Sequence, residues 1–272
     1  MEVTLLGTGD TTGTPTPGCG CDTCRTATER GVERTRFSVH VQTDEGALLV
    51  DASPDLRHQF LREGVPLPDA AVITHIHFDH LDGLGNAYRL VSSLPVYAAD
   101  EVDPQTGESV ADTVASKYHY LDRVSVEPRS PFERFEACGL ELTLVPVEHP
   151  PLLSYGLAVE DPATGGRLAI TGDTNFGVPE RSREALAGAD LMLADGIVPA
   201  SFCEHHSLGG RHAAPDGTYR TFGTKHMTFE GARSLAEELD AGRLRIVHAS
   251  HFPGPAEAFA ADVAVDGERY EL

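Results

Sequence analysis

The 272-residue sequence contains no tryptophan and only two lysines, Lys117 and Lys225. Its 42 acidic residues face 21 basic ones, which gives a formal net charge of −21. A protein that binds a polyanion normally presents a basic face, and no stretch of this sequence is rich in lysine and arginine. The composition therefore argues against nucleic acid as a partner and favours a solvated acidic shell.

The sequence also lacks a long hydrophobic run. No apolar segment approaches the roughly 20 residues that a membrane-spanning helix needs, and the start, MEVTLLGTGD, lacks the charged and apolar regions of a signal peptide. The five cysteines are odd in number and three of them lie within six positions. That spacing favours metal ligation in a reducing compartment over a disulfide framework. We therefore expect a cytoplasmic protein without a membrane anchor.

No internal repeat or low-complexity linker divides the chain, so we expect one domain over residues 1–272. Strand-like apolar runs occur in both halves, with helical segments between them, which predicts an α/β fold of two packed sheets flanked by helices. Helices are expected at residues 54–64 with Gly64 as the stop, 81–90, 108–120, 183–188, and 228–242 with Gly242 as the cap. Residues 197–224 fit no regular element and predict a long loop, of a kind that is usually functional or mobile.

The segment THIHFDH, residues 74–80, places three histidines and one aspartate directly after the apolar run AAVI. Side chains two positions apart in an extended segment share a face, so His75 and His77 are expected to bind one ion. Asp79 and His80 fall where the chain must turn into a helix, and we expect them to bind a second ion. Imidazole and carboxylate ligands suit Zn²⁺, Mn²⁺ or Fe²⁺. The segment therefore predicts a two-metal site.

Further ligands are expected at the ends of other strands. His149, Asp173 and His248 each terminate an apolar run. Singly such residues are more often caps or loop contacts, but together they complete a ligand count. The assignment is His75, His77 and His149 to one ion, Asp79, His80 and His248 to the other, and Asp173 as the bridge. Asp51 ends another strand, and we expect it to orient a ligand imidazole rather than to bind metal.

Two divalent ions about 3.5–4 Å apart can share a hydroxide and stabilise an oxyanion, which is the chemistry of hydrolysis at phosphorus or at a carbonyl. The HxHxDH motif, the downstream histidine, the GDT aspartate and the last histidine after a strand resemble the metallo-β-lactamase superfamily. The resemblance covers most of the chain. It implies an αββα sandwich of two mixed sheets with a dinuclear site at its rim.

A second group of metal ligands lies near the N-terminus. The segment CGCDTC brings Cys19, Cys21 and Cys24 into a glycine-rich loop, taken as residues 18–30, with spacing that lets the thiolates converge on one tetrahedral Zn²⁺. The alternative is three free surface thiols, an oxidation risk. No fourth ligand lies nearby in sequence, but His251, three residues after His248, is a candidate.

The cysteine triplet, the intact HxHxDH motif and the terminal H-x-x-H together resemble the PhnP-type phosphodiesterases. This resemblance implies hydrolysis of small cyclic phosphodiesters, such as 5-phosphoribosyl 1,2-cyclic phosphate, at two active-site ions, either zinc or manganese. It implies a structural zinc on Cys19, Cys21, Cys24 and His251. It further implies that His226, in KHMTFEGA, is the general acid, although a histidine there can equally well be a residue at a helix start. Asp79 is expected to orient the attacking hydroxide.

Other functions stay open at this point. A tRNA 3′-processing nuclease shares HxHxDH, a thioester or lactam hydrolase could use the same ions, and a PqqB-like accessory protein carries a similar cysteine loop. Because all seven predicted ligand positions hold suitable side chains, we prefer an enzyme over a binding protein. A small-molecule phosphodiester is the expected partner, and a homodimer is left open. His205, His206 and His212 are interpreted as solvated loop residues rather than as a further metal site.

Overall fold

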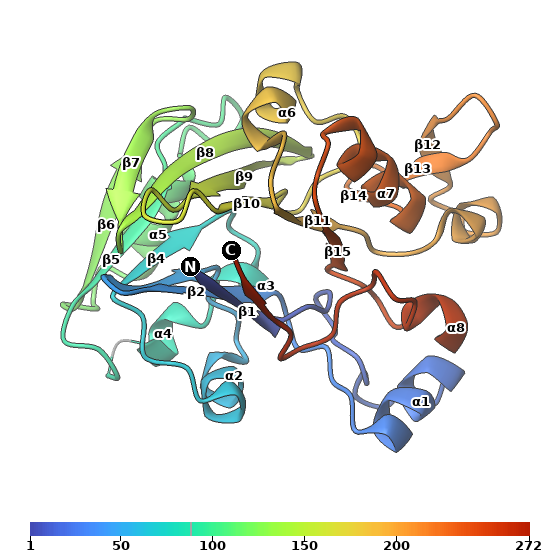
Figure 1. Cartoon of the computed structure of the whole chain (residues 1–272), viewed down its shortest axis with the longest axis horizontal. Coiled ribbons are helices and arrows are strands. Elements are labelled where there is room, and N and C mark those ends of the chain that lie inside the picture. Colours follow the sequence, from blue (N-terminus) through green and yellow to red (C-terminus); the bar gives the residue numbers. More distant parts are fainter. Residues whose placement is uncertain (88) are drawn as a thin grey trace.

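The computed structural model describes residues 1–87 and 89–272. Two β-sheets pack face to face, and helices cover the outer side of each, as Figure 1 shows. Helices α2 and α5 lie against the first sheet, and α6 and α7 lie against the second. This is the αββα sandwich that the sequence predicts.

The first sheet has seven strands, and the four at one end run parallel. β1, β2 and β3 pair antiparallel, whereas β3, β4, β5 and β6 pair parallel. In spatial order the strands are β16 (Arg269–Glu271), β1 (Glu2–Gly7), β2 (Ser38–Thr43), β3 (Gly46–Val50), β4 (Ala70–Ile73), β5 (Leu94–Ala99) and β6 (Val124–Arg129).

The second sheet has six strands, with a parallel group at one end. β10, β11 and β15 pair parallel, and β7, β8, β9 and β10 pair antiparallel. In spatial order the strands are β15 (Leu244–Val247), β11 (Leu191–Asp195), β10 (Arg167–Ile170), β9 (Leu152–Glu160), β8 (Leu140–His149) and β7 (Arg134–Ala137).

Strands β10 and β11 of the second sheet are buried on both faces. Successive strand residues point to opposite sides, and β10 shows this alternation. Leu168 and Ile170 join the main apolar cluster between the two sheets, whereas Ala169 joins a second cluster beneath α6 and α7. Met192 of β11 and Leu235 of α7 pack in the same second cluster. A strand with two buried faces can expose polar side chains only at its ends.

The helices are short and most begin or end at identifiable caps. They are α1 (Asp22–Arg30), α2 (Leu56–Glu63), α3 (Phe78–Leu81), α4 (Leu84–Ala87), α5 (Val110–Lys117), α6 (Glu180–Leu186), the 3₁₀ helix η1 (Ala200–Glu204), α7 (Phe229–Glu238) and α8 (Pro255–Ala258). α2 ends at Gly64, which is left-handed with φ 65°, as expected. Ser109 and Asp112 form a reciprocal capping box that starts α5.

Three expectations about secondary structure need correction. The helix expected at residues 81–90 is divided into α3 and α4, and its residue 88 lies outside the described part of the chain. α7 ends at Glu238 rather than at Gly242, because Asp240 adopts the left-handed conformation (φ 51°) that an aspartate tolerates. In the cysteine-rich segment, residues 22–30 form helix α1 rather than a loop.

The long loop expected at residues 197–224 is also wrong in part. This segment contains η1 and two strands, β12 (Gly210–Ala213) and β13 (Tyr219–Phe222), which pair with β14 (His226–Met227) in a small third sheet. Three of the four residues of β12 are exposed, so the strand carries no apolar alternation. In Figure 1 this sheet projects beside α7.

The chain ends meet at one edge of the first sheet. β16 pairs with β1, and the N-terminal ammonium donates to Asp161 and to the Leu272 carbonyl. Among the described residues, the search for membrane spans found no helix with the length and apolarity that a bilayer crossing requires.

Thr228 joins helix α7 to the third sheet and offers a test of this region. Its hydroxyl accepts from the Gly231 backbone N–H and donates to the Tyr219 carbonyl. We expect Thr228→Ala to lower the free energy of unfolding by about 1–2 kcal/mol, because a cap and a buried hydrogen bond are both lost. Thr228→Ser retains both bonds and should unfold near the wild-type denaturant concentration. Equal stability of the alanine and serine variants would contradict this account.

Candidate metal centre

The predicted site residues gather at one rim of the sandwich because parallel strands end there. Asp51 follows β3, and His75 lies two residues after β4. In the second sheet Asp173 follows β10, and His248 follows β15 directly. The carboxyl ends of parallel strands lie at the same edge of a sheet, so each sheet delivers its polar side chains to the same rim.

The backbone bends sharply where these strands end. Asp51 and His248 are buried and adopt left-handed conformations, with φ of 58° and 61°. Such a conformation costs a non-glycine residue of order 1 kcal/mol, and it persists only where the surrounding structure enforces it. Gly172, before Asp173, has φ 63°, and a Cβ atom there would lie 2.4 Å from the Tyr155 carbonyl oxygen. Only glycine fits that position.

The first predicted ligand set is assembled. His75 Nε2 lies 3.0 Å from His77 Nδ1, and His149 Nε2 lies 3.4 Å from the same His77 atom. One oxygen of Asp173 lies 3.6 Å from His75 Nε2. One ligand atom from each of these four residues falls within 4.8 Å of every other.

The second predicted set lies directly beside the first. His80 Nε2 is 3.7 Å from Asp79 Oδ2, and His248 Nε2 is 3.6 Å from the same oxygen. Asp173 reaches this set too, with Oδ1 3.4 Å from His80 and Oδ2 3.3 Å from His248. Asp173 therefore stands between the two sets, in the position expected of a bridge.

The donor atoms suit cations. In a tetrahedral site with Zn–N bonds of about 2.0 Å, ligand nitrogens lie about 3.3 Å apart, close to the spacings in both sets. His80 Nε2 and both ring nitrogens of His248 are buried and have no hydrogen-bond partner among the described residues. Buried polar atoms are rarely left unpaired. A bound cation would satisfy them.

Hydrogen bonds on the far side of the imidazoles aim their other nitrogens into the site. His80 Nδ1 donates to Asp51 Oδ2 at 2.6 Å, which is the orienting contact expected of Asp51. His149 Nδ1 donates to the Lys225 carbonyl at 3.1 Å. The Thr74 hydroxyl donates to Asp51, so it can accept from His75 Nδ1. Each of the three bonds leaves Nε2 as the atom facing the rim, a common feature of metal-binding histidines.

The two sets differ in charge. Burial lowers the pKa of His149 to about 3 and that of His75 well below its ordinary value, so both imidazoles are neutral ligands at pH 7. Burial also opposes the charged form of His248, but Asp173, Asp79 and Asp195 raise its pKa to about 9. The charge of Asp173 and Asp51 likewise outweighs burial and raises the pKa of His80. Ion binding at this second set therefore releases protons.

His226 lies at the mouth of the same centre. Its ring stacks on His248, with centroids 5.0 Å apart and 13° between the planes, and it lies 4.8 Å from the ring of His149. Its side chain is 14% exposed, whereas those of the two ligand histidines beside it are buried. The structure thus brings His226 to the site, as the family resemblance implies, in a place open to solvent.

Sequence reasoning missed Asp195. This buried residue ends β11, and its Oδ2 accepts from His226 Nδ1 at 3.0 Å and from the Thr174 backbone N–H at 2.9 Å. Burial raises the pKa of Asp195, and the nearby His226 opposes that rise. The signal was present, because LMLAD ends in an aspartate just as ALLVD does. Asp195 fixes the orientation of the His226 ring.

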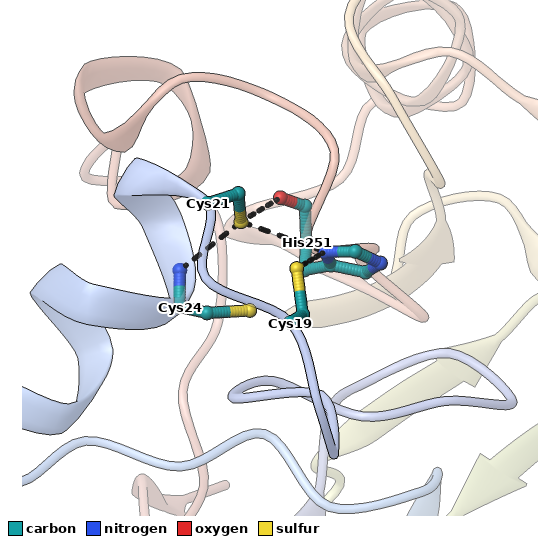
Figure 2. A group of neighbouring side chains, drawn as sticks. All are labelled: Cys19, Cys21, Cys24 and His251. Carbon is teal, nitrogen blue, oxygen red and sulfur yellow. Dashed lines mark hydrogen bonds between the residues drawn. The ribbon is translucent and has the colours of Figure 1, made fainter.

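The cysteine-rich segment forms a candidate ligand group that is separate from the two sets at the rim. Figure 2 shows the three sulfur atoms and the His251 ring pointing toward a common centre. Cys19 and Cys21 lie 3.4 and 3.6 Å from His251 Nδ1. A tetrahedral zinc with Zn–S of about 2.3 Å and Zn–N of about 2.0 Å separates sulfur from nitrogen by about 3.6 Å. His251 thus lies where a fourth ligand would be needed.

The thiols of this cluster differ in acidity. Burial raises the pKa of the Cys24 thiol to about 11. Burial acts on Cys21 in the same direction, but hydrogen bonds from His251 and from the Cys24 backbone N–H lower its pKa to about 6. Cys21 is therefore more ready than Cys24 to bind a cation as a thiolate.

The three remaining histidines of residues 197–224 do not join the metal centre. His205, His206 and His212 belong to none of the candidate ligand groups found among the described residues. His206 packs against Phe202 and Phe222, and His212 bonds to Thr221.

Comparison with known proteins defines the family. Residues 47–249 match the β-lactamase superfamily domain. The structure of a diphosphatase from the PhnP family matches all of this chain and 97% of its own, with a TM-score of 0.77 and 29% identity. A coenzyme PQQ synthesis protein B from Methylobacterium nodulans is 30% identical over 231 residues, 74% of each protein. The chain therefore belongs to the metallo-β-lactamase superfamily, and within it to the PhnP-type branch.

An octanoyltransferase from Porphyromonas gingivalis is 28% identical over 265 residues, which are 92% of this chain but 46% of that protein. The chain thus spans less than half of this relative. Members of the superfamily are mostly metal-dependent hydrolases, and the fold implies divalent metal binding at the rim described above.

Metal analysis tests both clusters together. We expect about three divalent ions per chain, two at the rim and one on the cysteines. Cys21→Ser should remove about one ion and lower the melting temperature, because metal binding at such a site contributes to folding stability. Cys203→Ser, at a buried cysteine outside the cluster, is the matched control for ion content. Two or fewer ions in the wild-type protein, or an unchanged melting curve for Cys21→Ser, would contradict this assignment.

Proposed function

We propose that the chain is a dinuclear-metal-dependent hydrolase of small phosphodiesters, with cyclic esters of the 5-phosphoribosyl 1,2-cyclic phosphate type as the leading substrates. One observation carries the proposal. Two imidazole–carboxylate sets share Asp173, and the His226–Asp195 pair stands beside them at the open side. Hydrolysis of a phosphodiester needs charge stabilisation at the phosphoryl oxygens, a nucleophile, and an acid that protonates the leaving group. Groups at this rim could provide all three.

The two ions, zinc or manganese, would supply Lewis acidity toward the phosphoryl oxygens and a nucleophile at neutral pH. His75, His77 and His149 would hold one ion and Asp79, His80 and His248 the other, with Asp173 shared. The Thr11 hydroxyl donates to Asp79 Oδ2 at 3.0 Å. That bond restrains the carboxylate that we assign to orienting the attacking water.

His226 is the proposed general acid. Its Nδ1–H is held by Asp195, so Nε2 is the atom that can carry a proton to the leaving alkoxide. The hydrogen bond to the buried Asp195 carboxylate keeps the ring in one orientation. We therefore assign Asp195 as a positioning residue that acts through His226.

The cysteine cluster has a structural role in this proposal. A zinc on Cys19, Cys21, Cys24 and His251 would join the N-terminal segment to the chain just after His248. Such thiolates persist in a reducing compartment, which favours the cytoplasm.

Charge and sequence similarity support a small substrate over the alternatives. One relative with a solved structure is a diphosphatase. A net charge of −21 opposes the long polyanion that a tRNA-processing nuclease must bind. Carbonyl hydrolysis uses the same ions, so thioesters and lactams belong in the substrate screen. A PqqB-like accessory role predicts no turnover of any ester, and it is the second candidate because of the 30% identity to that protein.

Asp79→Ala tests the assigned chemistry. We expect the metal-loaded variant to hydrolyse bis(p-nitrophenyl) phosphate at least 10²-fold more slowly. The ion would lose one ligand, and the attacking water would lose the carboxylate that orients it. Asp82→Ala removes an exposed neighbouring carboxylate that pairs with Lys117, and it should retain wild-type turnover. Turnover of the Asp79 variant at the wild-type rate would refute the role, whereas inactivity of the wild-type protein toward all phosphodiesters would refute the proposed function.

His226→Ala tests the general acid through the leaving group. An alkoxide needs a proton to depart, whereas p-nitrophenolate is stable without one. We expect a loss of about 10²–10⁴ in kcat for a cyclic ribose phosphate and a much smaller loss for bis(p-nitrophenyl) phosphate. His206→Ala, on the same segment but outside the ligand groups, is the control. An equal loss on both substrates would mean that His226 only supports the structure.

A further inference from the structure

The ring of His226 keeps the same spacing from the histidines of the metal centre as those histidines keep from one another. Two imidazoles on one tetrahedral ion, with Zn–N bonds of about 2.0 Å, have ring centroids about 5 Å apart. The histidine pairs assigned above to a shared ion have centroids 4.8 to 5.5 Å apart. His226 lies 5.0 Å from His248 and 4.8 Å from His149. By distance, His226 belongs to the centre.

One buried carboxylate lies behind both His226 and His248. Asp195 Oδ2 accepts from His226 Nδ1 at 3.0 Å, and Asp195 Oδ1 lies 3.9 Å from His248 Nδ1. The two rings are nearly parallel, with 13° between their planes. Because both Nδ1 atoms face the same carboxylate, both Nε2 atoms point to the opposite side, into the rim.

His226 is held in the way that metal-binding histidines usually are. A ligand imidazole commonly donates its second ring N–H to a carboxylate, as His80 does to Asp51 at 2.6 Å. The bond from His226 to Asp195 repeats that arrangement at the end of another strand, β11. The contact therefore suits an imidazole that binds a cation as well as one that carries a proton.

A further group of candidate ligands contains His226. One ligand atom each from Asp173, His226 and His248 lies within 4.8 Å of the other two. Within this group Asp173 Oδ2 is 3.3 Å from His248 Nε2, and His248 Nε2 is buried without a hydrogen-bond partner among the described residues. The group shares His248 with the second set, and one imidazole nitrogen binds one ion at a time. The two groups are therefore alternative positions for a single ion.

We propose that the ion of the second set has an alternative position, in which Asp173, His226 and His248 hold it and Asp79 and His80 do not. The side chain of His226 is 14% exposed, so water can reach the remaining coordination position. An ion on His226 Nε2 occupies the nitrogen that carries the proton, and the two roles of His226 exclude each other. Only this last consequence, a resting state without an available acid, rests on the proposed function.

Zinc affinity measured in two backgrounds tests the alternative position. In the Asp79→Ala protein the ion has lost a ligand of its first position, so the alternative should hold more of it. His226→Asn should then weaken binding of the second rim ion about tenfold in a titration with Zn²⁺ alone. In the wild-type background the second set is intact, and the same substitution should change this affinity by less than about twofold. The control His206→Ala should weaken zinc binding in neither background. Asp79→Asn, which retains the side-chain volume, serves as a second background.

Asparagine is used at position 226 because its amide can donate to Asp195 but offers no ring nitrogen. His226→Ala should weaken zinc binding in the Asp79→Ala background by the same factor. If alanine weakens binding and asparagine does not, the effect comes from the lost contact with Asp195, and the proposal is wrong. Equal zinc affinity of the Asp79→Ala protein with and without His226 would also overturn it.

Crystals of zinc-loaded Asp79→Ala provide a direct observation. Anomalous scattering should place the second rim ion about 2.0 Å from His226 Nε2, and an ion that remains on His80, away from His226, would contradict the proposal. None of these measurements uses a substrate. Failure to cleave any phosphodiester would therefore refute the proposed function and leave the alternative position standing. Diester hydrolysis by a protein whose zinc affinity never depends on His226 would refute the alternative position alone.

Discussion

The structure depends on the gathering of buried acids and imidazoles at the carboxyl ends of parallel strands. Asp51, Asp173 and Asp195 are buried together with His75, His80 and His248. An isolated charge in such a place costs several kcal/mol, so these groups are tolerable only as a mutually compensating set or with a cation among them. The two sheets supply that compensation because their parallel strands end at one shared rim. A change in the order of the strands would leave the same residues as unpaired buried charges.

This topology explains why much of the site could be predicted from the sequence. HxHxDH is local, and the pairing of His75 with His77 follows from strand geometry alone. His149, Asp173 and His248 were found because each ends an apolar run. Asp195 carries the same signal, but it was missed because no family motif drew attention to it. Its role depends on the position of His226, more than 30 residues away in sequence.

The third sheet could not have been predicted by the same reasoning. β12 has four residues, three of them exposed, and β14 has two, so neither carries an apolar pattern. Their pairing depends on η1, on α7 and on Thr228, which are tertiary contacts. The missed third sheet matters for function because His226 begins its strand β14. His226 and the strands before it are positioned by contacts that leave no periodic trace in the sequence.

The acidic surface and the cations expected at the rim have to be considered together. With a net charge of −21, the molecule as a whole repels phosphorylated compounds, yet salt screens exposed charges over about 8 Å at physiological ionic strength. Acidic groups farther than this from the rim have little effect on an anion there. The groups at the rim itself therefore determine which anions it accepts. At the rim those groups would be the two metal ions and Lys225, whose charge acts on His77. An acidic shell with a cationic rim repels a long polyanion, which must lie across both, but admits a small ester that contacts the rim alone. The same charge that argues against a nucleic-acid substrate is therefore compatible with a small phosphate ester.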